Sequence, residues 1–168
     1  MFAAINQVKK SEIRWYLDYN EEKSQYDKLA MNTKETIASI DHCLNPFLIL
    51  TNRKSNLVLF DNAPSHVSKK TQEFLSTIGV EYIPFGGKNG GIYGGYPANS
   101  PDLNPIENIF GILQEKVNSK QPKNVDELID TVANEWNEID MNHIRKTIRS
   151  LPKRMRWIMK NNGDYYNC

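Results

Sequence analysis

The chain has 168 residues, of which 39% are hydrophobic and 24% are charged, and its formal net charge is +1. This length suits one domain over residues 1–168, which we expect to have its sheet and motifs in residues 1–122 and closing helices in residues 123–168. No apolar run approaches the roughly 18 residues that a membrane helix needs, and no signal peptide is visible, so we expect an intracellular, non-membrane protein. Cys43 and Cys168 have no metal-binding spacing and are expected to be free thiols.

The first third of the chain predicts two strands followed by a helix. Phe2–Asn6 is short and apolar, and residues 13–18 alternate apolar and polar side chains as a half-buried strand does. Residues 33–50 place apolar side chains on one helical face, with Thr33 as the candidate cap. Pro46 is expected to bend or end this helix, because proline lacks the backbone N–H group.

Strands and helices then alternate, and helices complete the chain. Asn56–Phe60 (NLVLF) is a continuous apolar run, typical of a central strand that is covered on both faces. The further expected elements are a helix over Lys69–Ile78 stopped by Gly79, a strand over Val80–Ile83, and helices over Pro105–Val117, Val125–Ile139 and Asn142–Asn161. The last helix is expected to break or kink near Pro152, with Ser150 as a new cap. This order predicts an α/β domain with a mixed sheet.

Two acidic residues occupy positions where local structure and chemistry both offer an explanation. Asp61 directly follows NLVLF, and ligand sites of open α/β sheets collect at strand ends. The same Asp61–Pro64 segment is also a typical turn. Glu107 stands third in a helix that Asn104 and Pro105 can begin, which is close to a capping box. His66 is a candidate to orient a carboxylate, although a lone histidine is often structural.

Two longer strings narrow these alternatives. The chain resembles mariner-type transposases of the Tc-mariner superfamily in two sequence motifs and in their order. The motif DNAPSH (residues 61–66) is followed by a helix, a strand ending in Pro84 and then the motif SPDLNPIENIFG (residues 100–111). DELIDTVANEWNEID and IRKTIRSLPKRMRWIMKNNG resemble the helices that close the catalytic domain of that family. The resemblance is strong over residues 56–163 and weak over residues 2–50.

This resemblance implies a ribonuclease-H-like fold and an enzyme that cuts and rejoins transposon DNA, located in the nucleus if the cell is eukaryotic. Asp61 looks like the second acid and Glu107 like the third acid of an Asp-Asp-Glu site, where two Mg²⁺ or Mn²⁺ ions would drive phosphoryl displacement. The motif positions expected to shape that site are Asn62, His66, Asp102 and Asn104. The implied partners are transposon ends and target DNA.

Two departures from the family pattern affect the expected activity. The segment between the two acids, residues 62–106, is longer than in common members of the family. The glycine-rich residues 86–97 account for the extra length as a loop, and closing a longer loop costs little additional entropy. Phe2–Asn6 and Glu12–Tyr19 resemble the family's second and third strands, so its first strand and first Asp are expected to be missing. We therefore expect an N-terminally truncated domain with little nuclease activity by itself.

The C-terminal segment concentrates positive charge. Residues 143–160 contain seven Lys or Arg residues and no acid. The apolar residues expected to form one buried stripe are Ile144, Ile148, Leu151, Met155 and Met159. The basic stripe beside it, a candidate for DNA binding or a solvated surface, comprises Arg145, Arg149, Lys153, Arg156 and Lys160.

The alternative function is therefore a non-catalytic remnant that binds nucleic acid or a partner transposase, as a homodimer or with a full-length chain. A further alternative is a generic α/β domain whose motif residues are caps and turns.

Overall fold

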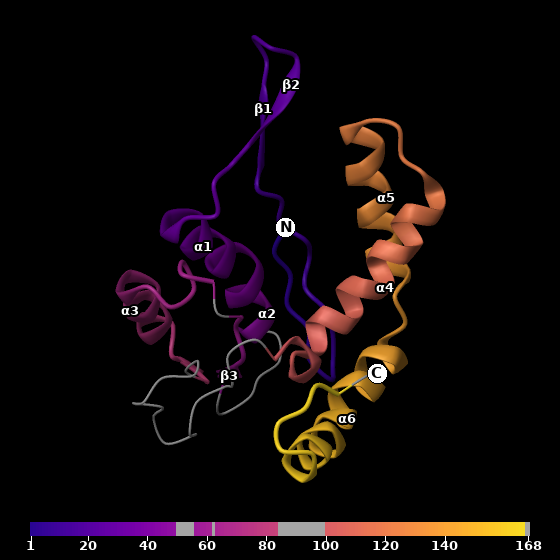
Figure 1. The fold of residues 1–168 in the computed structure, drawn as a ribbon. Coiled ribbons are helices and arrows are strands. Elements are labelled where there is room, and N and C mark those ends of the chain that lie inside the picture. The colour runs from indigo at the N-terminus through magenta and orange to yellow at the C-terminus, as the bar shows by residue number, and fades with distance from the viewer. Residues whose placement is uncertain (50–55, 62, 84–99, 167–168) are drawn as a thin grey trace. The chain divides into compact units, whose positions relative to one another are not determined.

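The computed structural model describes residues 1–49, 56–61, 63–83 and 100–166 (Figure 1). The chain forms two compact units: unit 1 comprises residues 1–4 and 11–99, and unit 2 comprises residues 5–10 and 100–168. Unit 2 therefore holds every helix that the structure describes after residue 100. The single domain over residues 1–168, divided near residue 122, stays a prediction. None of the helices in the described ranges is long and apolar enough to cross a membrane.

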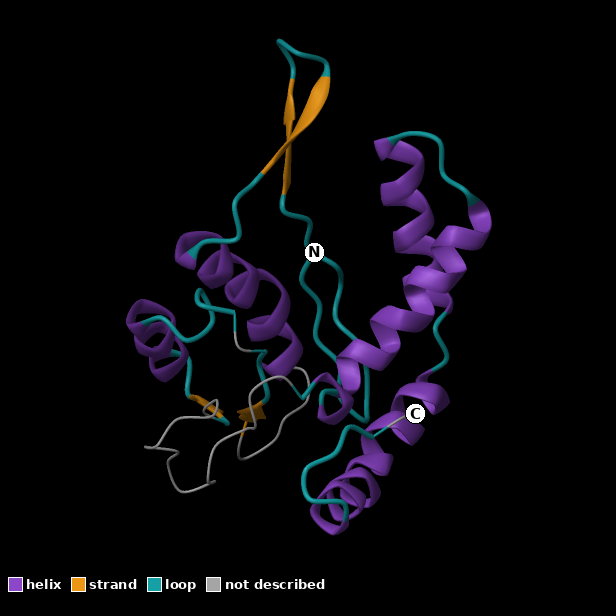
Figure 2. Ribbon diagram, viewed as in Figure 1, coloured by secondary structure: helices purple, strands orange, loops and turns teal. Residues whose placement is uncertain are grey.

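Unit 1 combines short strands with helices (Figure 2). Its elements are β1 (Leu17–Asn20), β2 (Gln25–Lys28), α1 (Thr33–Ser39), the π-helix η1 (Ile40–Leu44), α2 (Asn45–Ile49), β3 (Asn56–Val58), α3 (Lys69–Thr77) and β4 (Val80–Tyr82). β1 and β2 pair antiparallel with Leu17 opposite Lys28, and β3 and β4 pair parallel with Asn56 opposite Val80. The described strands thus form two separate pairs, one of each kind.

The predicted strand over Phe2–Asn6 is reduced to isolated antiparallel bridges, Phe2 with Arg14 and Ile5 with Lys10. The ladder is interrupted because the Ser11 hydroxyl, not a backbone carbonyl, accepts the hydrogen bond of the Ala4 amide at 2.8 Å. The alternating segment over residues 13–18 likewise becomes regular strand only from Leu17 onward. One side-chain hydroxyl therefore replaces part of the backbone pairing expected for Phe2–Asn6.

The long helix runs from Thr33 to Ile49 through a π-helical turn, so Pro46 does not end it. Asn32, not Thr33, is the cap, and its side chain accepts a hydrogen bond from the Glu35 amide at 3.0 Å. Pro46 has no N–H group to continue the i→i−4 ladder, and the ladder widens directly before it, with the Asn45 amide bonding to the Ile40 carbonyl. The proline is thus accommodated by a local change of helix type.

The core of unit 1 gathers apolar side chains from its N-terminal segment, helices and strands. Its buried members are Phe2, Tyr16, Ile40, Cys43, Leu44, Phe47, Phe60, Leu75 and Val80. Cys43 is a free thiol, as expected, and burial raises its pKa. Cys168 lies outside the described residues.

NLVLF does not form the doubly covered strand that the sequence suggested. β3 ends at Val58, and Leu57 is 46% exposed while Phe60 is buried in the core. Alternate strand residues face opposite sides, and among the described strands β3 pairs with β4 alone. One side of this short strand therefore packs on the core and the other faces outward.

Unit 2 is helical, with η2 (Pro101–Leu103), α4 (Pro105–Lys120), α5 (Val125–Glu138) and α6 (Met141–Lys160). Apolar positions spaced by three or four turn Ile109, Leu113 and Val117 of α4 inward, and α5 buries Val132 and Trp136. At the surface, Lys116 Nζ lies 3.0 Å from a carboxylate oxygen of Glu135, which joins α4 to α5. These contacts fix the helix that carries Glu107.

α6 differs from its prediction in two respects. The helix continues through Pro152, and Ser150 is not a cap: its hydroxyl donates to the Thr147 carbonyl at 2.7 Å. Met155 and Met159 are 44% and 80% exposed, so the predicted buried stripe is wrong at its C-terminal end. Because an α-helix has 3.6 residues per turn, residues spaced four apart, such as Met155 and Met159, turn progressively away from the buried face. Arg154 occupies the buried face at this end of the helix instead.

Candidate functional site

Asp61 lies in the coil that follows β3 and shapes the turn after it. Its Oδ1 atom accepts a hydrogen bond from the Ala63 amide at 3.1 Å, and the Ala63 carbonyl accepts one from the His66 amide at 2.8 Å. Asp61 therefore stands just before a turn over residues 63–66, and its side chain is half-exposed, at 49%. Asp61 can shape the turn and also be a metal ligand, because both hydrogen bonds described for its carboxylate are accepted by Oδ1 and not by Oδ2.

The second of those hydrogen bonds comes from His66. Its Nδ1 atom lies within hydrogen-bonding distance of Asp61 Oδ1, and an ionised carboxylate can only accept, so the ring donates. The ring is nine-tenths buried and packs near the rings of Phe2 and Phe60, with centroids 6.3 and 5.3 Å away. His66 thus links the Asp61 carboxylate to the core.

This arrangement favours the charged form of Asp61. The hydrogen bond from His66 lowers the pKa of the Asp61 carboxyl below its usual value, against the opposing effect of partial burial. The charge of His66 and the hydrogen bond from the Ala63 amide act in the same direction as that bond. An ionised carboxylate with an accessible oxygen is the form that a divalent cation requires.

Glu107 stands in the first turn of α4, and Pro105 occupies the first helical position as predicted. Asn104 begins the helix through its backbone, since its carbonyl accepts from the Glu107 amide at 3.1 Å. The predicted capping box is not formed from the Asn104 side, because that buried side chain makes no cap hydrogen bond. Glu107 itself is exposed to solvent, where it can meet a ligand.

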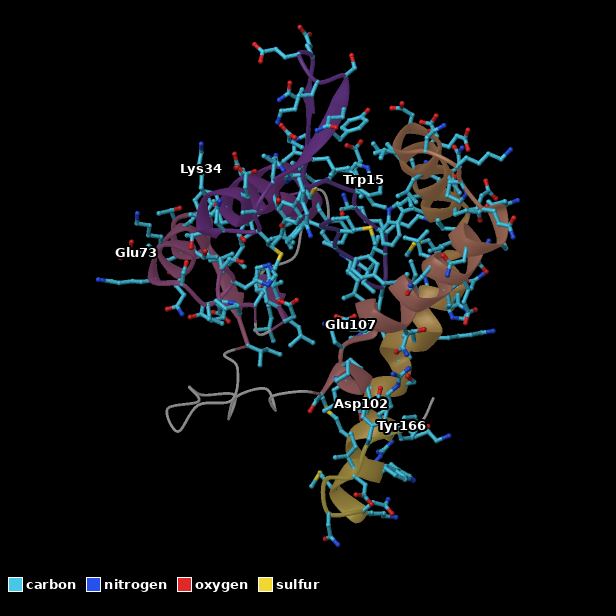
Figure 3. The ribbon with its side chains drawn as sticks, turned by 45° about the horizontal axis from the view of Figure 1, so that its top comes forward. Trp15, Lys34, Glu73, Asp102, Glu107 and Tyr166 are labelled. Atoms are coloured by element: carbon cyan, nitrogen blue, oxygen red, sulfur yellow. The ribbon has the colours of Figure 1, made fainter. Side chains whose placement is uncertain are left out.

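Asp102 has a structural role that its motif position did not reveal. The residue is only 4% exposed, and its Oδ2 atom accepts a hydrogen bond from the Tyr166 amide at 3.0 Å. Its carbonyl accepts a second one from Arg154 Nη1 at 2.8 Å. Figure 3 labels Asp102, Glu107 and Tyr166 on this unit. Asp102 thus ties the start of α4 to α6 and to the C-terminal tail.

Arg154 is the residue that sequence reasoning missed. It belongs to the basic segment but is 6% exposed, and it points inward on α6. The signal that could have found it is helical phase, because Arg154 lies in register with Ile144, Thr147 and Leu151 rather than with the basic stripe.

Most of the basic stripe is on the surface. Arg149, Lys153, Arg156 and Lys160 are exposed. Arg145 is half-buried, donating from Nε to the Gln7 carbonyl at 2.9 Å and from Nη1 to Asn142 Oδ1 at 3.0 Å. The three central residues, Arg149, Lys153 and Arg156, are therefore the best placed to contact a polyanion.

The predicted site residues fall in both units: Asp61 and His66 in unit 1, and Asp102, Asn104 and Glu107 in unit 2. Asn62 and the glycine-rich residues 86–97 lie outside the described residues. Within the described part of the chain, no group of three or more His, Cys, Asp or Glu side chains is arranged to hold a metal ion. The shared role of Asp61 and Glu107 as ligands stays a prediction.

Residues 9–129, more than half of the chain, match the DDE superfamily endonuclease family. The transposable element Tc3 transposase of Caenorhabditis elegans is 28% identical over 145 residues, which cover 85% of this chain and 41% of that protein. The Tc1 transposase of the same organism is 29% identical over 103 residues, covering 61% of this chain and 34% of that protein. The chain thus spans about two fifths of the length of these relatives, or less.

Solved structures of Mos1 transposase resemble the fold. The catalytic domain of Mos1 mariner transposase has a TM-score of 0.66 and 22% identity, covering 85% of this chain and 70% of that chain. A Mos1 paired-end complex with left transposon end has a TM-score of 0.67 and 21% identity, covering 85% and 41%. The Mos1 catalytic domain has also been solved with Mn and with Mg. This likeness confirms the predicted α/β, ribonuclease-H-like fold.

Proposed function

The chain belongs to the DDE superfamily endonucleases, and on that premise we propose that Asp61 and Glu107 are ligands of a divalent-metal centre acting on transposon DNA. The observation that carries the proposal is the family match over residues 9–129, which includes both acids. The local structure around each acid supports it. Asp61 is held ionised at the start of a turn, and Glu107 is exposed in the first turn of a helix.

The donor set suits the metal that the family implies. Carboxylate oxygens are the ligands that Mg²⁺ and Mn²⁺ prefer. When bound, such ions supply activation of the attacking oxygen and stabilisation of the leaving oxygen in phosphoryl transfer. His66 and the Ala63 amide both bond to Oδ1 of Asp61, which orients Oδ2 as the oxygen available to an ion. Glu107 would contribute its carboxylate from the first turn of α4.

Residues 1–168 supply matches to the second and third acids of the family site and none to the first. Two carboxylates leave a two-ion site incomplete, so we propose that a polypeptide of these residues cleaves DNA poorly by itself. Cleavage and strand transfer would then need a further acidic ligand. The proposed substrates are transposon ends and target DNA, and the proposed location is intracellular, or nuclear in a eukaryote.

A second candidate function is favoured by one observation on α6. Arg149, Lys153 and Arg156 are exposed together on a helix with no acid over residues 143–160. This stripe suits binding of DNA phosphates without chemistry, alone or beside a full-length transposase. The two candidate functions respond to different changes. Chemistry at the metal site should depend on the two carboxylates, whereas the affinity of simple DNA binding should depend on salt concentration.

Binding of Mn²⁺, followed by electron paramagnetic resonance, tests the first candidate. We expect Asp61→Asn and Glu107→Gln each to weaken binding by about tenfold or more, because each removes a charged oxygen ligand. Glu73→Gln and Asp130→Asn are matched controls on exposed faces of α3 and α5 and should bind like the unaltered chain. Equal binding by all four variants would show that these two acids hold no metal and leave the DNA-binding candidate.

A further inference from the structure

We propose that Arg154 is a positioning residue for Glu107: it fixes the first turn of α4, and through it the direction in which the Glu107 carboxylate points. This inference rests on the proposed function of Glu107 as a ligand. Every contact that carries it lies within unit 2.

The guanidinium of Arg154 holds the chain on both sides of Glu107. Nη1 donates to the Asp102 carbonyl at 2.8 Å and to Oδ1 of Asn108 at 2.6 Å. Asp102 lies in η2, just before α4, and Asn108 directly follows Glu107. One side chain of α6 therefore joins the turn that precedes the helix to the helix's own first turn.

Two further contacts fix the guanidinium itself. Nε donates to the Ser150 hydroxyl at 2.8 Å, one turn earlier in α6. The guanidinium carbon lies 5.8 Å from the ring centroid of Tyr166, whose amide donates to Asp102 Oδ2 at 3.0 Å. Tyr166 also meets Trp157 edge to face, with centroids 5.4 Å apart. The C-terminal tail thus closes over the arginine that holds α4.

The burial of this charge indicates that the arrangement is specific. Within the described residues Arg154 forms no ion pair, and its guanidinium donates hydrogen bonds to a carbonyl, an amide oxygen and a hydroxyl. A buried cation is costly unless its donors are satisfied, and the planar fork of arginine can reach several acceptors at once. Lysine keeps the charge but carries one compact ammonium, so it cannot reproduce this geometry.

The test compares Arg154→Lys with Lys146→Arg, the reverse exchange at an exposed position of α6 outside the basic stripe. Amide hydrogen exchange over residues 102–109 reports the position of the backbone, and Mn²⁺ affinity reports the carboxylate. For Arg154→Lys we expect exchange in this segment to rise about tenfold and Mn²⁺ affinity to fall about tenfold, the size of a typical loss when a ligand's support is removed. Lys146→Arg should change neither quantity.

Asn108→Ala is a milder second variant, because it removes one acceptor and leaves Arg154 in place. Should Arg154→Lys fail to fold, Asn108→Ala is expected to raise exchange over the same segment and to weaken Mn²⁺ binding in the same direction. Unchanged exchange in Asn108→Ala, or faster exchange with unchanged Mn²⁺ affinity while Glu107→Gln weakens it, would overturn the inference. Exchange needs no metal, so it decides the positioning claim even if Glu107→Gln shows that the proposed metal centre is wrong.

Discussion

His66 donates a hydrogen bond from Nδ1 to Oδ1 of Asp61, five residues earlier in the chain. The other ring nitrogen, Nε2, is buried and has no hydrogen-bond partner in the described structure. Asp61 is therefore the polar anchor of this ring, which also packs near the rings of Phe2 and Phe60. The side chain serves to hold one carboxylate oxygen in place.

We predict that His66→Ala weakens Mn²⁺ binding by about tenfold, because a carboxylate without its oriented partner is a poorer ligand. His66→Asn should restore part of the affinity, since an amide can still donate. His143→Ala, at an exposed histidine of α6, is the control and should bind Mn²⁺ normally. Equal affinity in His66→Ala and the unaltered chain would show that the hydrogen bond only shapes the turn.

The basic stripe of α6 yields a prediction about salt. Replacing Arg149, Lys153 and Arg156 with Ala should weaken binding to every DNA sequence to a similar extent. The log–log slope of affinity against salt should fall by about 0.9 for each DNA phosphate that the variant no longer neutralises. A control that replaces Lys34, Lys69 and Lys70, exposed on α1 and α3, removes equal charge from unit 1. If both triple variants lower the slope equally, the stripe acts only through net charge.

The exposed side of β3 predicts self-association. Leu57 is 46% exposed on a strand that, among the described residues, pairs only with β4. Exposed apolar strands recruit other chains, and a charge there opposes such pairing. We expect Leu57→Lys to lower the apparent mass of the concentrated protein in sedimentation, whereas Val67→Lys, 37% exposed in a turn, should not. A monomeric unaltered chain at high concentration would contradict this prediction.

The link between α4 and α5 predicts a loss of stability in acid. The hydrogen bond from Lys116 lowers the pKa of the Glu135 carboxyl, aided by the charges of Lys116 and Lys120 and opposed by desolvation. Because the pKa of Glu135 is lower in the folded chain than its ordinary value of 4.5, the ionised carboxyl stabilises the fold at pH values above 4.5. This stabilisation is lost as the pH falls through the pKa of the folded state. Glu135→Gln should unfold more easily in urea at pH 7 but match the unaltered chain in strong acid. A pH-independent difference would contradict the link.

Local sequence signals predicted where the helices lie, because helix ends depend largely on near neighbours, although the predicted caps Thr33 and Ser150 were wrong. Ser68 caps α3 and Gly79, with φ of +67°, stops the chain after it, while Asn124 caps α5 through the Glu127 amide. The strands were predicted less well, since pairing depends on distant partners. Phe2–Asn6 has a strand-like composition, yet the Ser11 hydroxyl takes one of its ladder hydrogen bonds.

The residues of the proposed site could be named from the sequence, whereas the contacts that hold them in place could not. Asp61 and Glu107 stand in recognisable sequence motifs, and the histidine of the first motif forms a hydrogen bond with the aspartate. Arg154 looked like one more surface charge, because composition does not reveal which face of a helix is buried. Its partners, Asp102 and Asn108, lie 52 and 46 residues away, and only the fold brings them together.

Iron-directed cleavage of the protein tests whether Asp61 and Glu107 bind the same metal centre. With Fe²⁺ in place of Mg²⁺, ascorbate and peroxide generate radicals at the bound ion that cut the neighbouring peptide chain. If both acids hold one centre, we expect cuts beside both Asp61 and Glu107, suppressed together by excess Mg²⁺, and the loss of both cuts in Glu107→Gln. Cuts beside only one of the two acids, or cuts beside Asp61 that persist in Glu107→Gln, would contradict it.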